Sequence, residues 1–284
     1  MQQAISKDGT SIAYNRLGKG PAVILVAGAL GTRSHPMFAD LSALLAPDFT
    51  VYNYDRRGRG DSGDTAPYAV QREVEDIEAL IAEAGGSASL YGLSSGAALA
   101  LEAASKLPTK VRKLALYEPP FIVDDSHPPI PKDYVQRLDK LIAAGRRGDA
   151  VEVFMTDAIG IPAEFVAQMR GAPQPMDQAP DQPPSWAEME KVAHTLAYDG
   201  RVMGDTMSGN PLPTDRWTSA TPPTLVITGG DSEAFFHHGA RALADVLPNA
   251  RTSILEGQAH NVDSAALAPV LDEFFRGEEH GRQE

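Results

Sequence analysis

The chain is built around Ser89-Leu90-Tyr91-Gly92-Leu93-Ser94-Ser95-Gly96-Ala97-Ala98-Leu99-Ala100, which predicts a short strand, a G-x-S-x-G turn and an alanine-rich helix in direct succession. Gly92 and Gly96 carry no side chain, so the strand and the helix can approach closely. The turn between them forces Ser94 into a strained backbone conformation and lifts its hydroxyl clear of the sheet. There the free N–H groups of a helix N-terminus can stabilise an oxyanion. We therefore predict that Ser94 is a nucleophile rather than an ordinary serine of a glycine-rich turn.

Strand and helix patterns alternate on both sides of this turn. Strand patterns occur at residues 22–27, 50–54, 111–117, 224–228 and 251–255, and the run at 22–27 is continuously apolar, as is typical of a strand buried on both faces. Helical patterns separate them, at residues 37–45, 70–81, 234–247 and 263–275. Two further short strands, 2–6 and 11–16, flank an Asp8-Gly9 turn. The fold class is thus predicted to be α/β, with a mostly parallel central sheet flanked by helices.

The alternation stops between residues 121 and 220. This stretch has helical patterns at 134–142, 151–159, 165–169 and 186–198 but no convincing strand, and residues 172–185, rich in proline and glutamine, predict an irregular connection. We expect a helical cap, or lid, at 121–220, inserted into a core made of residues 1–120 and 221–284.

Composition narrows the functional classes. The net charge of −13 disfavours nucleic acid and anionic membrane surfaces as partners. The chain has no cysteine, which excludes disulfides, thiolate metal sites and a cysteine nucleophile. No cluster has metal-ligand spacing, so we expect neither a metal nor an organic cofactor. Without a signal-peptide pattern or a membrane-length apolar run, a cytoplasmic protein acting on a small molecule is expected. The sequence does not distinguish a monomer from a dimer.

Four features together resemble the α/β-hydrolase family, and the resemblance covers essentially the whole chain. The first is the apolar strand before Gly28-Ala29-Leu30. The second is the segment Asp55-Arg56-Arg57-Gly58-Arg59-Gly60-Asp61-Ser62, which is similar to the family's D-x-R-G-x-G-x-S turn. The third and fourth are the G-x-S-x-G turn Gly92-Leu93-Ser94-Ser95-Gly96 and the loop Gly257-Gln258-Ala259-His260. The order of nucleophile, acid and histidine along the chain is also that of the family.

The resemblance implies a role for several residues. Ser94 needs a base within hydrogen-bond reach, and His260, between the last strand and the last helix, is at the family's position for it. The backbone N–H groups of Ala29 and Ser95 are expected to form the oxyanion hole, even though Ala27 stands where many relatives have histidine. Asp55 and Arg57 are expected to fix a turn by hydrogen bonds rather than to take part in chemistry.

The sequence leaves the third catalytic residue open between two carboxylates. The family usually has an aspartate three residues beyond the glycine that here is Gly229, but this position is Ser232, with Asp231 directly before it. Members that resemble haloalkane dehalogenases take the acid from the end of an earlier strand, which here is Glu118. We predict that either Glu118 or Asp231 is the acid, with a slight preference for Glu118.

A serine nucleophile implies an acyl-enzyme formed from an ester, thioester or lactone. Apolar side chains in the predicted cap suggest a small or medium, largely apolar substrate. We therefore expect a carboxylesterase-like hydrolase. The same residues would serve a C–C bond hydrolase or a cofactor-free haloperoxidase (perhydrolase), or a ligand sensor with little turnover. Haloalkane dehalogenases and epoxide hydrolases use a carboxylate where Ser94 stands, which argues against both.

Overall fold

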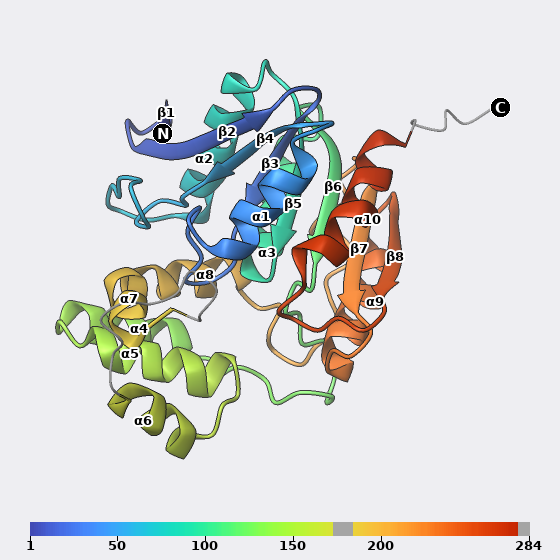
Figure 1. Ribbon diagram of the computed structural model, residues 1–284. Coiled ribbons are helices and arrows are strands. Elements are labelled where there is room, and N and C mark those ends of the chain that lie inside the picture. Colours follow the sequence, from blue (N-terminus) through green and yellow to red (C-terminus); the bar gives the residue numbers. More distant parts are fainter. Residues whose placement is uncertain (173–183, 278–284) are drawn as a thin grey trace.

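A mostly parallel sheet forms the centre of the computed structural model, which describes residues 1–172 and 184–277 (Figure 1). The strands of this described part lie in the order β1-β2-β4-β3-β5-β6-β7-β8. The pairs β1–β2 and β2–β4 are antiparallel, and every other pair is parallel. The strands are β1 (Gln2–Ile5), β2 (Ser11–Gly18), β3 (Ala22–Val26), β4 (Thr50–Tyr54), β5 (Ala88–Leu93), β6 (Val111–Tyr117), β7 (Thr224–Gly229) and β8 (Ala250–Leu255). The predicted α/β class and mostly parallel sheet are confirmed.

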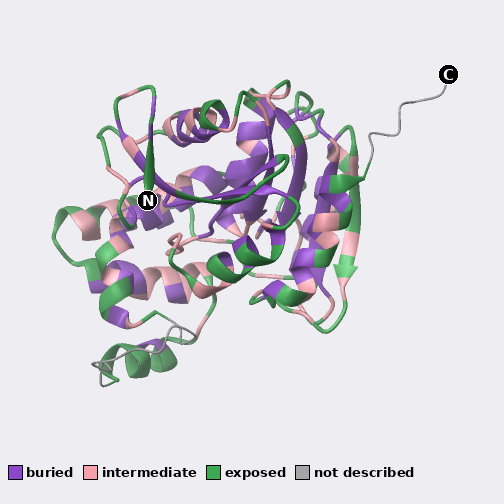
Figure 2. Ribbon diagram, turned by 45° about the horizontal axis from the view of Figure 1, so that its top comes forward, coloured by how far each residue is buried: buried purple, intermediate pink, exposed green. Residues whose placement is uncertain are grey.

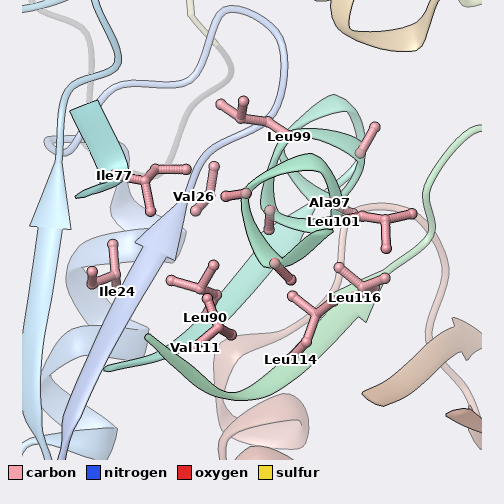
Figure 3. Close-up of a cluster of buried hydrophobic side chains, with 14 of the residues drawn as sticks. Ile24, Val26, Ile77, Leu90, Ala97, Leu99, Leu101, Val111, Leu114 and Leu116 are labelled. Atoms are coloured by element: carbon pink, nitrogen blue, oxygen red, sulfur yellow. The ribbon is translucent and has the colours of Figure 1, made fainter. Parts of the chain in front are cut away.

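One layer of helices covers each face of the sheet. Successive side chains of a strand point to opposite faces, so each buried strand contributes to an apolar cluster on both sides. In β3, Val23 and Leu25 belong to the apolar cluster under α1 (Pro36–Leu45) and α10 (Ser264–Arg276). Ile24 and Val26 belong to the cluster on the other face (Figure 3). The helices over that face are α2 (Val70–Glu83), α3 (Ser95–Lys106) and α9 (Ala234–Val246). The buried strands between the two layers appear as the purple centre of Figure 2.

A helical segment connects β6 to β7 and lies at one end of the sheet (Figure 1). Its helices in the described residues are α4 (Tyr134–Ala143), α5 (Arg147–Val153), the π-helix η1 (Phe154–Ala158), α6 (Ala163–Gly171), α7 (Trp186–Val192), the 3₁₀ helix η2 (Ala193–Thr195) and α8 (Leu196–Met203). These helices share an apolar cluster of their own, whereas residues at both ends of the segment, such as Phe121 and Trp217, pack into the main core. Most of the irregular connection predicted at 172–185 lies outside the described residues.

The helix predicted at 186–198 is interrupted at η2. The hydroxyl of Thr195 donates a hydrogen bond to the carbonyl of Val192, three residues earlier, at 2.8 Å. Such a bond competes with the regular helical pattern and tightens the turn. After the interruption α8 starts at Leu196, which places Asp199 in its first turn.

The turn between β5 and α3 depends on the two glycines of the G-x-S-x-G motif. A Cβ atom on Gly96 would lie 2.3 Å from the carbonyl oxygen of Val26 and 2.5 Å from that of Ala27, at the end of β3. A Cβ atom on Gly92 would lie 2.5 Å from the carbonyl oxygen of Gly96. These neighbours are backbone atoms of packed elements and have little freedom to move away. Only glycine lets α3 begin against β3 and β5.

We predict that Gly96→Ala lowers the free energy of unfolding by about 3 kcal/mol, because the added methyl group overlaps the backbone of β3. Chemical denaturation measures the change. Gly171→Ala is the matched control. Gly171 also lies in a helix, and no atom of the described residues lies within 4 Å of the place its added methyl group would take, so stability should be unchanged or slightly higher. Equal free energies of unfolding for the two variants would contradict the close approach of α3 to β3.

Candidate active site

Backbone strain in the described residues gathers at one edge of the sheet. Across 1–172 and 184–277, the residues other than glycine with positive φ are Leu30 (60°), Ser94 (57°) and Glu118 (46°). They follow β3, β5 and β6, which are neighbouring parallel strands, so all lie at the carboxyl edge. Side chains rarely adopt this conformation unless the surrounding structure imposes it, and such strain concentrates at functional sites. The strain marks this edge as the candidate site.

Ser94 occupies the turn that the sequence predicts for a nucleophile. It is the N-cap residue of α3, and its backbone N–H donates to the carbonyl of Tyr117 at 2.9 Å. Its side chain is half-buried and lines a cavity, and its hydroxyl has no hydrogen-bond partner among the described residues. The hydroxyl is therefore available to a molecule in that cavity.

Two backbone donors stand beside Ser94. Ser95 is the first residue of α3, so its N–H has no partner within the helix. The N–H of Ala29 lies in the loop after β3, and within the described chain it likewise has no backbone partner. Both residues line the same cavity as Ser94. The pair meets the chemical requirement of an oxyanion hole, which is two free donors next to the attacking oxygen.

His260 pairs with Glu118. The Nδ1 atom of the imidazole lies 2.7 Å from Oε2 of Glu118. The carboxylate is completely buried and accepts two further hydrogen bonds, from the backbone N–H of Gly229 at 2.7 Å and from the hydroxyl of Ser232. A buried carboxylate facing Nδ1 favours the imidazole tautomer with the proton on Nδ1, which leaves Nε2 able to accept a proton.

Asp231, the other carboxylate considered from the sequence, has different surroundings. Its side chain is exposed and forms no hydrogen bond or ion pair within the part of the chain that the structure describes, while its backbone N–H donates to Gln258 at 2.9 Å. Ser232, at the position where the family usually has its acid, donates to Glu118 instead. The geometry brings Glu118, and not Asp231, to His260.

Aromatic groups orient the His260 loop. The ring of Phe236 stacks on the imidazole, with 4.8 Å between ring centroids and 18° between the planes. The hydroxyl of Tyr117 donates to the carbonyl of Ala259, the residue before the histidine, at 2.7 Å. The imidazole is thus held on one face by a ring, on one edge by a carboxylate and through its backbone by Tyr117. Neither Phe236 nor Tyr117 was marked by any motif in the sequence.

The cavity at Ser94 is small and largely apolar, with a volume of about 170 Å³. It lies between the carboxyl edge of the sheet and the segment that connects β6 to β7. The lining residues from that segment include Tyr134, Phe154, Ala158, Gly200 and Met203. Within the described residues no lysine or arginine lines it, and its lining residues with a carboxyl or imidazole group are Asp199, Glu233, His127 and His260.

The turn after β4 carries charged residues with structural contacts. As expected, Asp55 accepts hydrogen bonds from the backbone N–H groups of Arg33 at 2.7 Å and Asp61 at 3.0 Å. Arg57 forms a bidentate pair with Asp76 at 2.8 and 2.7 Å. The sequence did not mark their neighbours Arg56 and Arg59, which are buried beside the loop after β3 and donate to the carbonyls of Ala27 and Gly28. The D-x-R-G-x-G-x-S turn was the only signal that could have drawn attention to them.

The described residues form neither a metal-binding cluster nor a membrane span. Across residues 1–172 and 184–277, no three histidine, aspartate or glutamate side chains are grouped so that they could hold a metal ion. No helix in that part of the chain combines the length and the hydropathy needed to cross a bilayer.

Comparisons with known proteins agree with this geometry. A family model described as "Alpha/beta hydrolase family" matches residues 23–272. The crystal structure of an alpha/beta hydrolase from Sphaerobacter thermophilus is 54% identical, with a TM-score of 0.84 over 96% of this chain and 100% of that one. The enol-lactonase from Burkholderia xenovorans has a TM-score of 0.68 at 20% identity, over 97% of this chain and 100% of that one, which supports the fold alone. The uncharacterized hydrolase YraK of Bacillus subtilis is 32% identical over 39% of this chain, and the match spans only 42% of YraK.

We predict that Ser94→Gly is more stable than Ser94→Ala by about 1 kcal/mol. Both substitutions remove the hydroxyl, but only glycine relieves the strain of φ 57° and ψ −127°, and this gain exceeds the entropy that glycine adds to the unfolded chain. Urea denaturation of the two variants measures the difference. A more stable Ser94→Ala would show that the turn is not strained.

Proposed function

The chain belongs to the alpha/beta hydrolase family, and we propose that it is a serine hydrolase that cleaves small or medium, uncharged and largely apolar carboxylic esters or lactones. The observation that carries the proposal is the pairing of His260 with the buried Glu118, at the edge of a cavity that the unpartnered Ser94 hydroxyl also lines. Nucleophile, base and orienting acid are the parts that acyl transfer to a serine requires.

In the first half of the reaction, Oγ of Ser94 attacks the carbonyl carbon of the ester while Nε2 of His260 takes the hydroxyl proton. The negative charge that develops on the carbonyl oxygen is stabilised by the N–H groups of Ala29 and Ser95. The imidazolium then gives its proton to the departing alcohol, and the acyl group remains on Ser94. The described residues contain no hydrogen bond between Ser94 and His260. Such bonds often form only when substrate closes the site.

In the second half, a water molecule attacks the acyl-enzyme, with His260 again as the base, and the acid product leaves. Glu118 holds the imidazole in the tautomer needed for both halves and stabilises the imidazolium that forms. Its own hydrogen bonds to Gly229 and Ser232 keep the carboxylate oriented. Asp231 takes no part in this mechanism.

The dimensions and charge of the cavity support the substrate class. An apolar cavity of about 150 Å³ holds one benzene ring, so about 170 Å³ accommodates an acyl group of about six carbons. The described lining contains no lysine or arginine, so it lacks a permanently charged partner for a negatively charged substrate. We further propose that residues 121–220 act as a cap, because side chains from α4, η1 and α8 close the cavity over Ser94.

The wild-type protein should hydrolyse p-nitrophenyl esters, with the highest kcat/KM near four to six acyl carbons, because longer chains exceed the cavity. Ser94→Ala should abolish turnover, since no other nucleophile faces the carbonyl. p-Nitrophenyl hydrogen adipate, in which a carboxylate replaces the terminal methyl group of the hexanoate ester, should react at least about tenfold more slowly than the hexanoate. Initial rates of p-nitrophenol release measure all three.

The result that overturns the proposal is the absence of Ser94-dependent turnover across the ester series. Turnover of a ring-cleavage diketone or formation of a peracid, in place of ester hydrolysis, would point to the C–C bond hydrolase or the perhydrolase. A single stoichiometric burst would point to a ligand sensor.

Glu118→Gln should lower kcat by about three to four orders of magnitude, because the amide can donate to Nδ1 and then favours the wrong imidazole tautomer. Asp231→Asn is the matched control and should keep kcat within about threefold of the wild type. Steady-state kinetics with the best ester decides between the two carboxylates. A large loss in Asp231→Asn alone would assign the acid to that residue.

A further inference from the structure

Four buried charged side chains lie behind the candidate oxyanion hole. Arg56 forms a bidentate pair with Glu73, with both nitrogen–oxygen distances at 2.7 Å. Arg56 also donates to Oδ1 of Asp199, and Arg59 donates to Oδ2 of the same carboxylate, each at 2.7 Å. All four are buried, and the two guanidinium groups are almost inaccessible to solvent. We refer to Arg56, Arg59, Glu73 and Asp199 as the buried charge cluster.

The buried charge cluster has two positive and two negative charges and is therefore neutral as a whole. Burial would raise the pKa of Asp199, but Arg59, Arg56 and the hydroxyl of Ser95 outweigh it and hold that pKa below its ordinary value. Asp199 consequently remains ionised throughout the pH range in which a histidine base titrates.

Arg59 fixes one of the two oxyanion donors through the backbone. Its Nη1 donates to the carbonyl oxygen of Gly28 at 2.5 Å, and Nη1 of Arg56 donates to the carbonyl oxygen of Ala27 at 3.2 Å. The Gly28 carbonyl and the Ala29 N–H belong to the same planar trans peptide unit, so they point in opposite directions. A guanidinium that holds the carbonyl therefore also sets the direction of the N–H, and it polarises the unit so that the N–H becomes a stronger donor.

Asp199 reaches the residue that carries the other donor. Its Oδ1 accepts a hydrogen bond from the side-chain hydroxyl of Ser95 at 2.7 Å. The hydroxyl thereby fixes Ser95 against the same carboxylate that holds Arg59. Both donors, at Ala29 and Ser95, are thus anchored to a single buried carboxylate on α8.

We propose that the buried charge cluster positions the oxyanion hole, with Arg59 and Asp199 as positioning residues. This inference rests on the proposed function, because it assigns the cluster a part in stabilising the acyl-transfer transition state. The inference also assigns a second role to the segment between β6 and β7. Besides closing the cavity, that segment supplies Asp199, without which Arg59 and Ser95 have no common anchor.

The test removes the Arg59–Asp199 pair without leaving an unpaired charge. In the double variant R59M/D199N the cluster stays neutral, because Arg56 keeps Glu73 and the new amide at position 199 can still accept from Arg56. The matched control is R57M/D76N, which removes another buried arginine–aspartate pair with no described hydrogen bond to the loop that contains Gly28 and Ala29. Arg57 also pairs with Asp8, whose carboxylate in the control keeps its hydrogen bond from the N–H of Thr10. Thermal unfolding shows whether each variant is folded.

We expect R59M/D199N to lower kcat for the best p-nitrophenyl ester by about 10²-fold, with KM changed by less than about threefold. The pH dependence of kcat should keep its shape, because His260 and Glu118 are untouched. R57M/D76N should retain kcat within about threefold. A merely structural role would affect both double variants alike, whereas the positioning role affects one.

The outcomes distinguish a failure of the positioning role from a failure of the proposed serine-hydrolase function. Unchanged kcat in R59M/D199N, or equal losses in the two double variants, overturns the positioning role while Ser94-dependent turnover of the wild type still stands. A wild type without that turnover overturns the proposed function, and the positioning role falls with it. If R59M/D199N does not fold, Ser95→Ala decides, since it breaks only the hydrogen bond to Asp199. It should lower kcat by about fivefold, and full activity would overturn the link through Asp199.

Discussion

The close approach of the first turn of α3 to the end of β3 is the constraint on which the candidate site depends. Because Gly96 has no side chain, the helix begins directly against the carbonyl oxygens of Val26 and Ala27. The chain can leave β5 and enter α3 at this distance only through the strained backbone of Ser94. The position of Ser94 and the nearness of the loop with Ala29 are therefore consequences of one packing contact. The N–H of Ser95 is free because Ser95 is the first residue of α3.

The same edge of the sheet contains buried charged side chains, each of which would destabilise the fold if it had no partner of opposite charge. An isolated charge loses its hydration on burial, and this cost is several kcal/mol even after the protein relaxes. Here each guanidinium has a carboxylate partner at 2.7 Å. Further donors reach the backbone carbonyls of Ala27 and Gly28 and the hydroxyl of Thr195. A satisfied network of this kind has few alternative arrangements of similar energy. It is therefore suited to hold a loop in one conformation.

The sequence predicted those structural features that depend on residues close together in the chain. The apolar runs, the G-x-S-x-G turn and the glycine-to-histidine loop are local patterns, and they placed Ser94 and His260 at the edge where the structure has them. The acid remained open, because its identity depends on contacts between distant segments. Glu118 lies 142 residues before His260. In retrospect Ser232 was the informative residue, since a hydroxyl at the usual acid position can support a carboxylate that comes from elsewhere.

The buried charge cluster could not be deduced from the sequence at all. Arg56 and Asp199 are 143 residues apart, and an aspartate in an amphipathic helix is normally expected to face solvent. Its burial results from the way α8 packs, since a Cβ on the next residue, Gly200, would lie 2.8 Å from the side chain of Val135 in α4.

In the proposed mechanism, the cavity that selects the substrate and the groups that position the oxyanion donors share one short helix, α8. Gly200 and Met203 line the cavity, while Asp199 anchors both candidate oxyanion donors. A substitution that moves α8 to admit a larger acyl group would also move Asp199 away from Arg59 and Ser95. The cavity of this protein is therefore less free to change its size than one whose cap only covers the substrate. Changes of specificity should arise more readily from η1, whose Phe154 and Ala158 line the cavity, than from α8 or from α4, which packs against α8.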